Sequence, residues 1–238
     1  MKSRPRGLAV LALALVLAVP GARAQSPEGK LYSPGPFDRL EIDGAGAVRL
    51  VQGDRDEVFV SGDPQTVSSV SVERVGNQMH LSLPGGWKFW EADKTQVEVR
   101  MRTVSRITLS GVSDLVASGT IKSPSLGIDI AGSGAARFED LRAESLNFTI
   151  SGSGEGQLAG RVEVLKLSVS GRGKISADQL QVGDARVSIS GVGNADLWVT
   201  DTLNANISGA GHVHYRGQPK VRQSISGLGS VEASAERR

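Results

Sequence analysis

The sequence has no cysteine among its 238 residues. Disulfides, thiolate catalysis and cysteine metal sites are therefore excluded, and the stability of the chain must come from packing. Aromatic residues are scarce, at 4%, whereas glycine occurs 30 times. This composition predicts an all-β protein with many tight turns and thin aliphatic layers.

The first 24 residues have the pattern of a secretory signal peptide. Lys2, Arg4 and Arg6 form a basic start, an apolar run follows over residues 8–19, and Ala22 and Ala24 supply the small residues of a cleavage site. The apolar run is too short to cross a hydrocarbon core, which takes about 20 residues. We expect residues 1–24 to be removed, no transmembrane segment in the mature chain, and a periplasmic or extracellular location.

Removal of the signal peptide changes the net charge of the chain. Four of the 27 basic residues and none of the 25 acidic ones lie within residues 1–24, so the mature chain has 23 basic and 25 acidic residues and a formal charge of −2. A chain with this balance has no overall attraction to nucleic acid or to an anionic membrane surface. Neither is expected as a partner.

A Ser-Gly-x-Gly element recurs along the chain, with two copies slightly altered, and its first glycines are spaced 18 to 21 residues apart. A recurring period of this length is typical of stacked repeats. The first glycines are Gly111, Gly132, Gly152, Gly171, Gly191, Gly209 and Gly227.

The residues around each glycine alternate between apolar and polar. The position two before it is aliphatic in every copy, from Leu109 to Ile225, and the position three before it is polar in every copy, from Thr108 to Ser224. Because side chains alternate along a strand, one face of each strand is buried. The pattern predicts a single-stranded parallel β-helix, with the glycines at sharp corners in positive φ and the preceding serines in an external row.

The amino-terminal third repeats less regularly. We expect an extended lead-in at 25–36 and a β-helix domain at 37–234, followed by a short tail at 235–238. Within the domain, residues 37–106 are interpreted as irregular, wider coils and residues 107–234 as the regular Ser-Gly-x-Gly coils. A separate small sandwich at the amino terminus is the alternative.

Three aromatic residues, Trp87, Phe89 and Trp90, lie close together in an expected loop. They could cover an open part of the core. They could also form an exposed contact surface, since aromatic residues are enriched in binding hot spots.

The chain resembles the head GIN domain family of autotransporter adhesins. The segment from Phe37 to Gly53 resembles the start of the family pattern and the later Ile-Ser-Gly-Ser-Gly copies resemble its body, so the match extends from residue 37 to about 233. The resemblance implies an exported β-helical protein with no catalytic residues to transfer. It also implies adhesion, although we do not expect this chain to export itself as an autotransporter does, because residues 37–238 leave no room for a carboxy-terminal membrane barrel.

No catalytic motif or cofactor-binding motif is recognised in the sequence. The one weak metal candidate is a column of His212, His214, Asp196 and Glu232, in which coil alignment places His214 between the two carboxylates. A solvated charge ladder explains this column equally simply.

The sequence therefore favours a non-enzymatic cell-envelope protein that binds glycan or another envelope protein through its flat faces. The alternatives are a polysaccharide-active enzyme and a self-associating structural module, for which a homo-oligomer would be expected.

Overall fold

The computed structural model describes residues 29–84 and 96–234. The predicted signal peptide at 1–24, the aromatic residues Trp87, Phe89 and Trp90, and the predicted tail at 235–238 lie outside the described residues.

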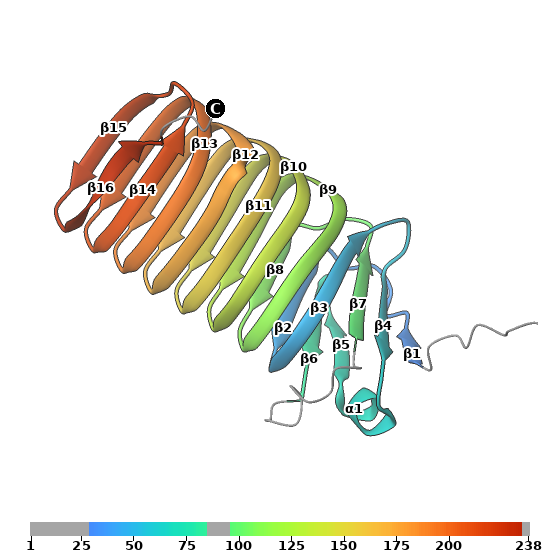
Figure 1. Cartoon of the computed structure of the whole chain (residues 1–238). Helices are drawn as coiled ribbons and strands as arrows, with labels where there is room; N and C mark the ends of the chain where they lie inside the picture. Colours follow the sequence, from blue (N-terminus) through green and yellow to red (C-terminus); the bar gives the residue numbers. More distant parts are fainter. Residues whose placement is uncertain (1–28, 85–95, 235–238) are drawn as a thin grey trace, which may run out of the picture.

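The body of the protein is a parallel β-helix of about six turns, as the repeat predicted (Figure 1). Each coil is one long, bent strand that pairs in parallel with the coil before it and the coil after it. The long strands are β9 (Val112–Ile130), β10 (Ser133–Ile150), β11 (Ser153–Val169), β12 (Arg172–Ile189) and β13 (Val192–Ile207). The next coil is divided into β14 (Ala210–Arg216) and β15 (Lys220–Ile225), and β16 (Leu228–Ala233) begins a further coil beside β14.

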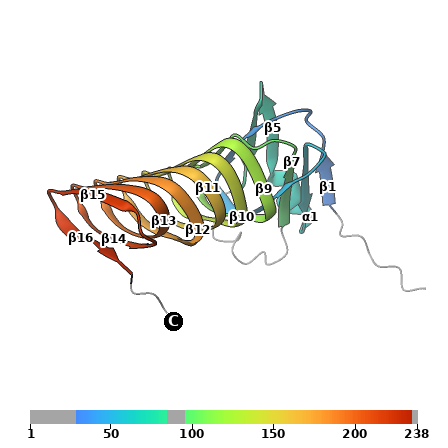
Figure 2. The same ribbon diagram turned by 90° about the horizontal axis from the view of Figure 1, so that it is seen from above.

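Each coil contributes to two faces that meet at the Ser-Gly corner. Face A consists of the segments that follow the corner in each coil. Its strands lie side by side in the order of the coils, beginning with β3 (Ala45–Gln52) and residues 112–118 of β9 and ending with β14 and β16. Face B consists of the segments before the corner, which pair from β8 (Arg106–Leu109) through residues 127–130 of β9 to β15. Figure 2 shows the coils following one another along the rod, which crosses the picture from β16 to β9.

The core lies between the two faces and is built from the alternating residues that the sequence identified. Leu109, Ile130, Ile150 and their equivalents up to Ile207 are at most 2% exposed. The exception is Ile225, which is 39% exposed because it belongs to the last described coil. Equivalent side chains lie in register from one coil to the next, so like residues stack on like.

The corner glycines are needed for a different reason from the one expected. None of the seven has a positive φ. Instead, a Cβ on Gly171 would overlap the carbonyl oxygen of Gly152, the corner glycine of the preceding coil, and the same overlap with the preceding corner recurs at each of the seven positions. The corner is crowded because Ser151 N and Gly152 N both donate to the carbonyl oxygen of Ile130, at 3.0 and 3.4 Å, and later corners repeat this pattern.

The amino-terminal region contains one regular coil and an antiparallel cap. β2 (Arg39–Asp43) and β3 form the first coil, whose outer edges are covered by β6 (Gln78–Ser82) and β7 (Gln96–Met101) in parallel. The strands β1 (Gly29–Tyr32), β4 (Glu57–Ser61) and β5 (Ser71–Val75) then pair antiparallel.

The pairing in this region differs from both the interpretation as irregular coils and its alternative. Irregular coils do not continue through 37–106, because β4 and β5 run against their neighbours. A separate sandwich is not formed either, since the buried side chains from Phe37 to Val213 make one continuous cluster.

The helix α1 (Pro64–Ser69) connects β4 to β5 and begins at Asp63, whose carboxylate accepts from the backbone of Gln65 and Thr66. Among the described residues, no helix has the length and hydropathy needed to cross a bilayer.

Candidate functional site

A column of cations and amides runs along the outside of face B. It occupies the position five residues before each corner glycine, and the register places its members directly beside one another on consecutive coils. The backbone spacing between neighbouring strands makes each step about 4.8 Å. From β10 to the last coil the column contains Asn147, Lys166, Arg186, Asn204 and Arg222, which are exposed or half-buried.

Two further columns of hydroxyl and amide side chains lie beside the first, three residues and one residue before each glycine from Gly152 to Gly227, whereas the coil that precedes them has Asp129 and Ala131 at these positions. Together the three columns form a surface that we call the basic hydroxyl face. Its other members are Thr149, Ser168, Ser188, Asn206, Ser224, Ser151, Ser170, Ser190, Ser208 and Ser226. None of these residues is acidic, whereas the outward positions of face A include Asp114, Glu155, Asp196 and Glu232.

The cations of the basic hydroxyl face are available for an external anion. Lys166, Arg186 and Arg222 form no ion pair with any residue in the described part of the chain. The acidic residues at the margins already have partners, since Asp129 lies 2.6 Å from Arg106 and Asp184 accepts from the hydroxyl of Thr202.

The side chains of this face are also largely unused within the fold. Among the described residues, the only side-chain hydrogen bond that they make is from Ser170 Oγ to the carbonyl oxygen of Ile150, at 3.4 Å. Because each hydroxyl and amide retains donors and acceptors, the face presents a flat array of groups suited to an extended polar ligand.

A shallow depression of 370 Å³ lies on the basic hydroxyl face near its carboxyl end. Arg186 and Arg222 line its two sides, and the amides of Asn204 and Asn206 lie between them. The two arginines are two coils apart, about 10 Å. Their guanidinium groups are the natural partners of carboxylate or phosphate oxygens.

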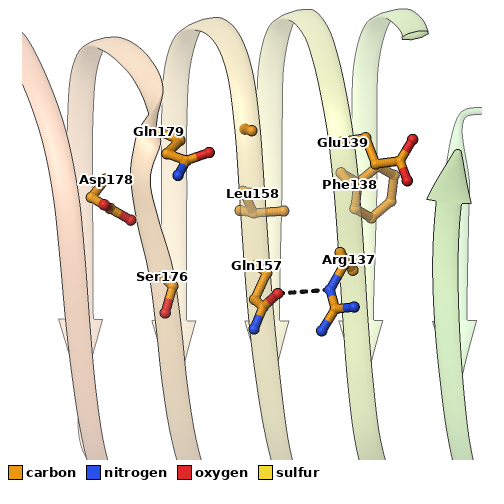
Figure 3. Close-up of a pocket in the computed structure, with 9 residues that line it drawn as sticks. Arg137, Phe138, Glu139, Gln157, Leu158, Ser176, Asp178 and Gln179 are labelled. Atoms are coloured by element: carbon orange, nitrogen blue, oxygen red, sulfur yellow. Dashed lines mark hydrogen bonds between the residues drawn. The ribbon is translucent and has the colours of Figure 1, made fainter. Parts of the chain in front are cut away.

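A second groove lies on face A, at the edge opposite the glycine corners, with a volume of 380 Å³. Figure 3 shows Glu139 and Asp178 on opposite sides of this groove, with Leu158 and Gln179 between them. Glu139 is bound to the protein itself, because its Oε2 accepts from the backbone N of Gly119 at 2.9 Å. One oxygen of the Glu139 carboxylate is therefore already used within the fold.

The same edge carries an acidic residue whose charge is stabilised internally. Thr120 Oγ1 donates to Asp140 Oδ2 at 2.7 Å, and Arg142 lies 3.0 Å from the same oxygen. The hydrogen bond from Thr120, reinforced by Arg142, lowers the pKa of Asp140. Asp140 therefore remains ionised and paired as a structural group.

The predicted histidine column is present in register but forms no metal cluster. Asp196, His214 and Glu232 occupy adjacent positions on consecutive coils, as alignment of the repeat indicated. His212 Nδ1 lies 3.0 Å from Ser230 Oγ, and its ring stacks on that of His214 at 6.3 Å between centroids. Over residues 29–84 and 96–234, no group of three or more histidine or acidic residues is arranged to hold a metal ion.

The sequence analysis recognised the serine and threonine rows but missed the column of cations. The signal was available five residues before each glycine, where acidic residues are absent from every copy. The alternation that identifies each strand depends on the apolar positions and the polar ones directly between them, and it does not single out this position.

Several solved structures have a similar fold. A putative adhesin from Bacteroides fragilis matches with a TM-score of 0.82 and 22% identity, over 89% of this chain and 98% of its own. A putative adhesin from Parabacteroides merdae matches with a TM-score of 0.66 and 20% identity, and a putative lipid binding protein from Parabacteroides distasonis with 0.65 and 19%. Each of these two matches covers 89% of this chain and 98% of the other. No curated protein matches the chain.

These similarities concern the fold, whereas a family model matches the sequence itself. It covers residues 36–219, which include the first coil, the cap and most of the regular coils. The chain therefore belongs to the family described as putative auto-transporter adhesin, head GIN domain.

Proposed function

We propose that this protein is an exported, non-enzymatic adhesin of the cell envelope that binds an acidic glycan along its basic hydroxyl face. The observation that carries the proposal is the combination on one flat surface of unpaired cations, many free hydroxyls and no carboxylate. Hydroxyl and amide groups complement sugar hydroxyls, and the cations complement the anionic substituents of a uronic acid or phosphorylated glycan.

Export is supported by the amino-terminal sequence, with its basic start, apolar run and cleavage site. Membership of an adhesin family supports binding to an external partner. The repeat of the surface supports a polymeric ligand, because equivalent side chains recur about every 4.8 Å and offer the same contacts to successive units of a chain.

Binding should be measured by biolayer interferometry with polygalacturonate as the acidic probe and dextran as the neutral one. The variant Lys166→Ala/Arg186→Ala removes two adjacent cations of the basic hydroxyl face. We expect it to weaken polygalacturonate binding by at least about tenfold, because each charge-assisted hydrogen bond contributes about 1.5–3 kcal/mol. Binding to polygalacturonate should also decrease with added salt.

The matched control is Arg172→Ala/Lys174→Ala, which removes the same charge from exposed positions of face A on β12. This control should bind as the unchanged protein does. Equal loss in both variants would mean that net charge, and not the basic hydroxyl face, attracts the glycan. Equally tight binding to dextran would contradict an acidic ligand, and shortening of the polymer during the assay would show an enzyme instead.

A further inference from the structure

The carboxyl end of the β-helix is open in the described chain. β15 pairs only with β13, and β16 only with β14, so the outer edges of both strands lack a backbone partner within residues 29–84 and 96–234. Figure 1 shows these two strands side by side at the end of the rod. Unpaired strand edges are ready templates for pairing with another chain.

The core is also exposed at this end. Val221 and Ile225 point inward, because they lie in register with the buried Leu203 and Ile207. They are nevertheless 37% and 39% exposed, whereas Leu203 and Ile207 are fully buried. An added layer of β-structure would cover them as each coil covers the one before it.

The opposite end of the rod does not present a coil. The outer edges of the first coil, β2 and β3, are already paired with β6 and β7, and the unpaired edges beyond them belong to β1 and β5, which run antiparallel to their neighbours. Of the arrangements of two copies, the one that joins coil to coil is therefore symmetric, with the open end of one molecule against the open end of a second copy.

The charges on the two edge strands select one of the two symmetric arrangements. The outward side chains of β15 include Lys220 and Arg222, and those of β16 include Glu232. A two-fold axis perpendicular to the faces would pair β15 with β15 and oppose like charges, which is unfavourable. A two-fold axis parallel to the strands would instead pair β15 of each copy with β16 of the other. Lys220 and Arg222 of one copy then lie beside Glu232 of the other, and this contact occurs twice in the dimer.

We infer that the protein forms a two-fold dimer, end to end, in which β15 of each copy pairs antiparallel with β16 of the other. The strand pairs provide the missing backbone hydrogen bonds and cover Val221 and Ile225. A two-fold axis along the strands turns face B of the second copy to the opposite side of the rod. If the proposed function holds, the dimer therefore presents its two basic hydroxyl faces in opposite directions and can connect two glycan surfaces.

The dimer is tested by sedimentation velocity of the purified protein over a range of concentrations, without any glycan. The unchanged protein should dimerise, and Glu232→Lys should weaken association by at least about tenfold, because it opposes like charges at both contacts. Lys220→Glu/Arg222→Glu should weaken it similarly. An equimolar mixture of these two variants should dimerise again, because each contact then joins opposite charges.

Restored association in the mixture cannot come from a merely structural effect of either substitution. Thermal unfolding of each variant should remain cooperative, since the substituted side chains are exposed, with the midpoint lowered only by the lost association. A monomer at every concentration would overturn the inference. Unchanged dimerisation of Glu232→Lys would also overturn it, because the contact would then lie elsewhere or would pair β15 with β15. Because the glycan assay is separate, failure of either proposal leaves the other to be judged by its own measurement.

Discussion

The stacked corner glycines allow a quantitative test of how the coils are held together. Gly171 lies in the middle of the rod, and a Cβ there would overlap the carbonyl oxygen of Gly152 and lie 2.6 Å from that of Ser151. In Gly171→Ala the two coils must separate locally. The substitution therefore acts on the contact between β11 and β12 and not on the backbone preference of a single residue.

The expected cost follows from the contacts that the separation weakens. Overpacking typically costs about 1–3 kcal/mol. Two corner hydrogen bonds, Arg172 N to Gly152 O at 2.9 Å and Gly171 N to Ile150 O at 3.5 Å, would lengthen, at about 0.5–1.5 kcal/mol each. We expect Gly171→Ala to cost about 2–6 kcal/mol in total, which lowers the thermal midpoint of a domain of this size by roughly 4–24 °C.

Two control variants separate crowding from backbone conformation. A Cβ on Gly53 would meet nothing within 4 Å, and its φ is not positive, so Gly53→Ala should change stability by less than about 0.5 kcal/mol or increase it slightly. Gly76 has a φ of 63° and equally open surroundings, so it should tolerate Asn. Thermal unfolding followed by circular dichroism measures all of these variants.

The decisive comparison is between Gly171→Asn and Gly76→Asn. Asparagine tolerates positive φ but has a Cβ, so crowding predicts a large loss at Gly171 and little change at Gly76. If Gly171→Asn and Gly171→Ala were both as stable as the unchanged protein, the carbonyl contacts would not constrain the corner and this explanation would be refuted.

Two further predictions concern charge and packing. Thr120 and Arg142 lower the pKa of Asp140 in the folded state, so its contribution to stability is present above its unfolded pKa, about 3.9, and is lost as the pH falls toward the lower folded value. In urea unfolding, Asp140→Asn should therefore lose less stability than the unchanged protein between about pH 5 and 2.5. Equal losses in the two proteins would contradict this role. Phe148 fills the space above Gly156, where a Cβ would meet Phe148 Cζ at 2.8 Å. Gly156→Ala should therefore lower the free energy of unfolding by about 1–3 kcal/mol in the unchanged protein and by less in a Phe148→Leu background. Additive losses would refute the contact.

The amino-terminal cap illustrates the limit of reading this sequence locally. Gly44 and Gly111 are far apart in the chain, yet a Cβ on Gly111 would overlap the carbonyl oxygen of Gly44, so they are corners of adjacent coils. The segment between them supplies β6 and β7, which cover the first coil, and β4 and β5, which turn back against these strands. Alternating apolar residues identify each strand but do not say whether its neighbour is parallel or antiparallel.

The β-helix, the buried side of each strand and the row of corner glycines all follow from the order of the residues, because a strand alternates its side chains locally and identical coils repeat that alternation. The reason for glycine at the corners is found in the fold, since the group that excludes a Cβ belongs to the preceding coil. The fold also places Lys166, Arg186 and Arg222 on one surface with no carboxylate among them. Both features depend on the register between coils, which is set by packing across the whole rod and not by any single segment.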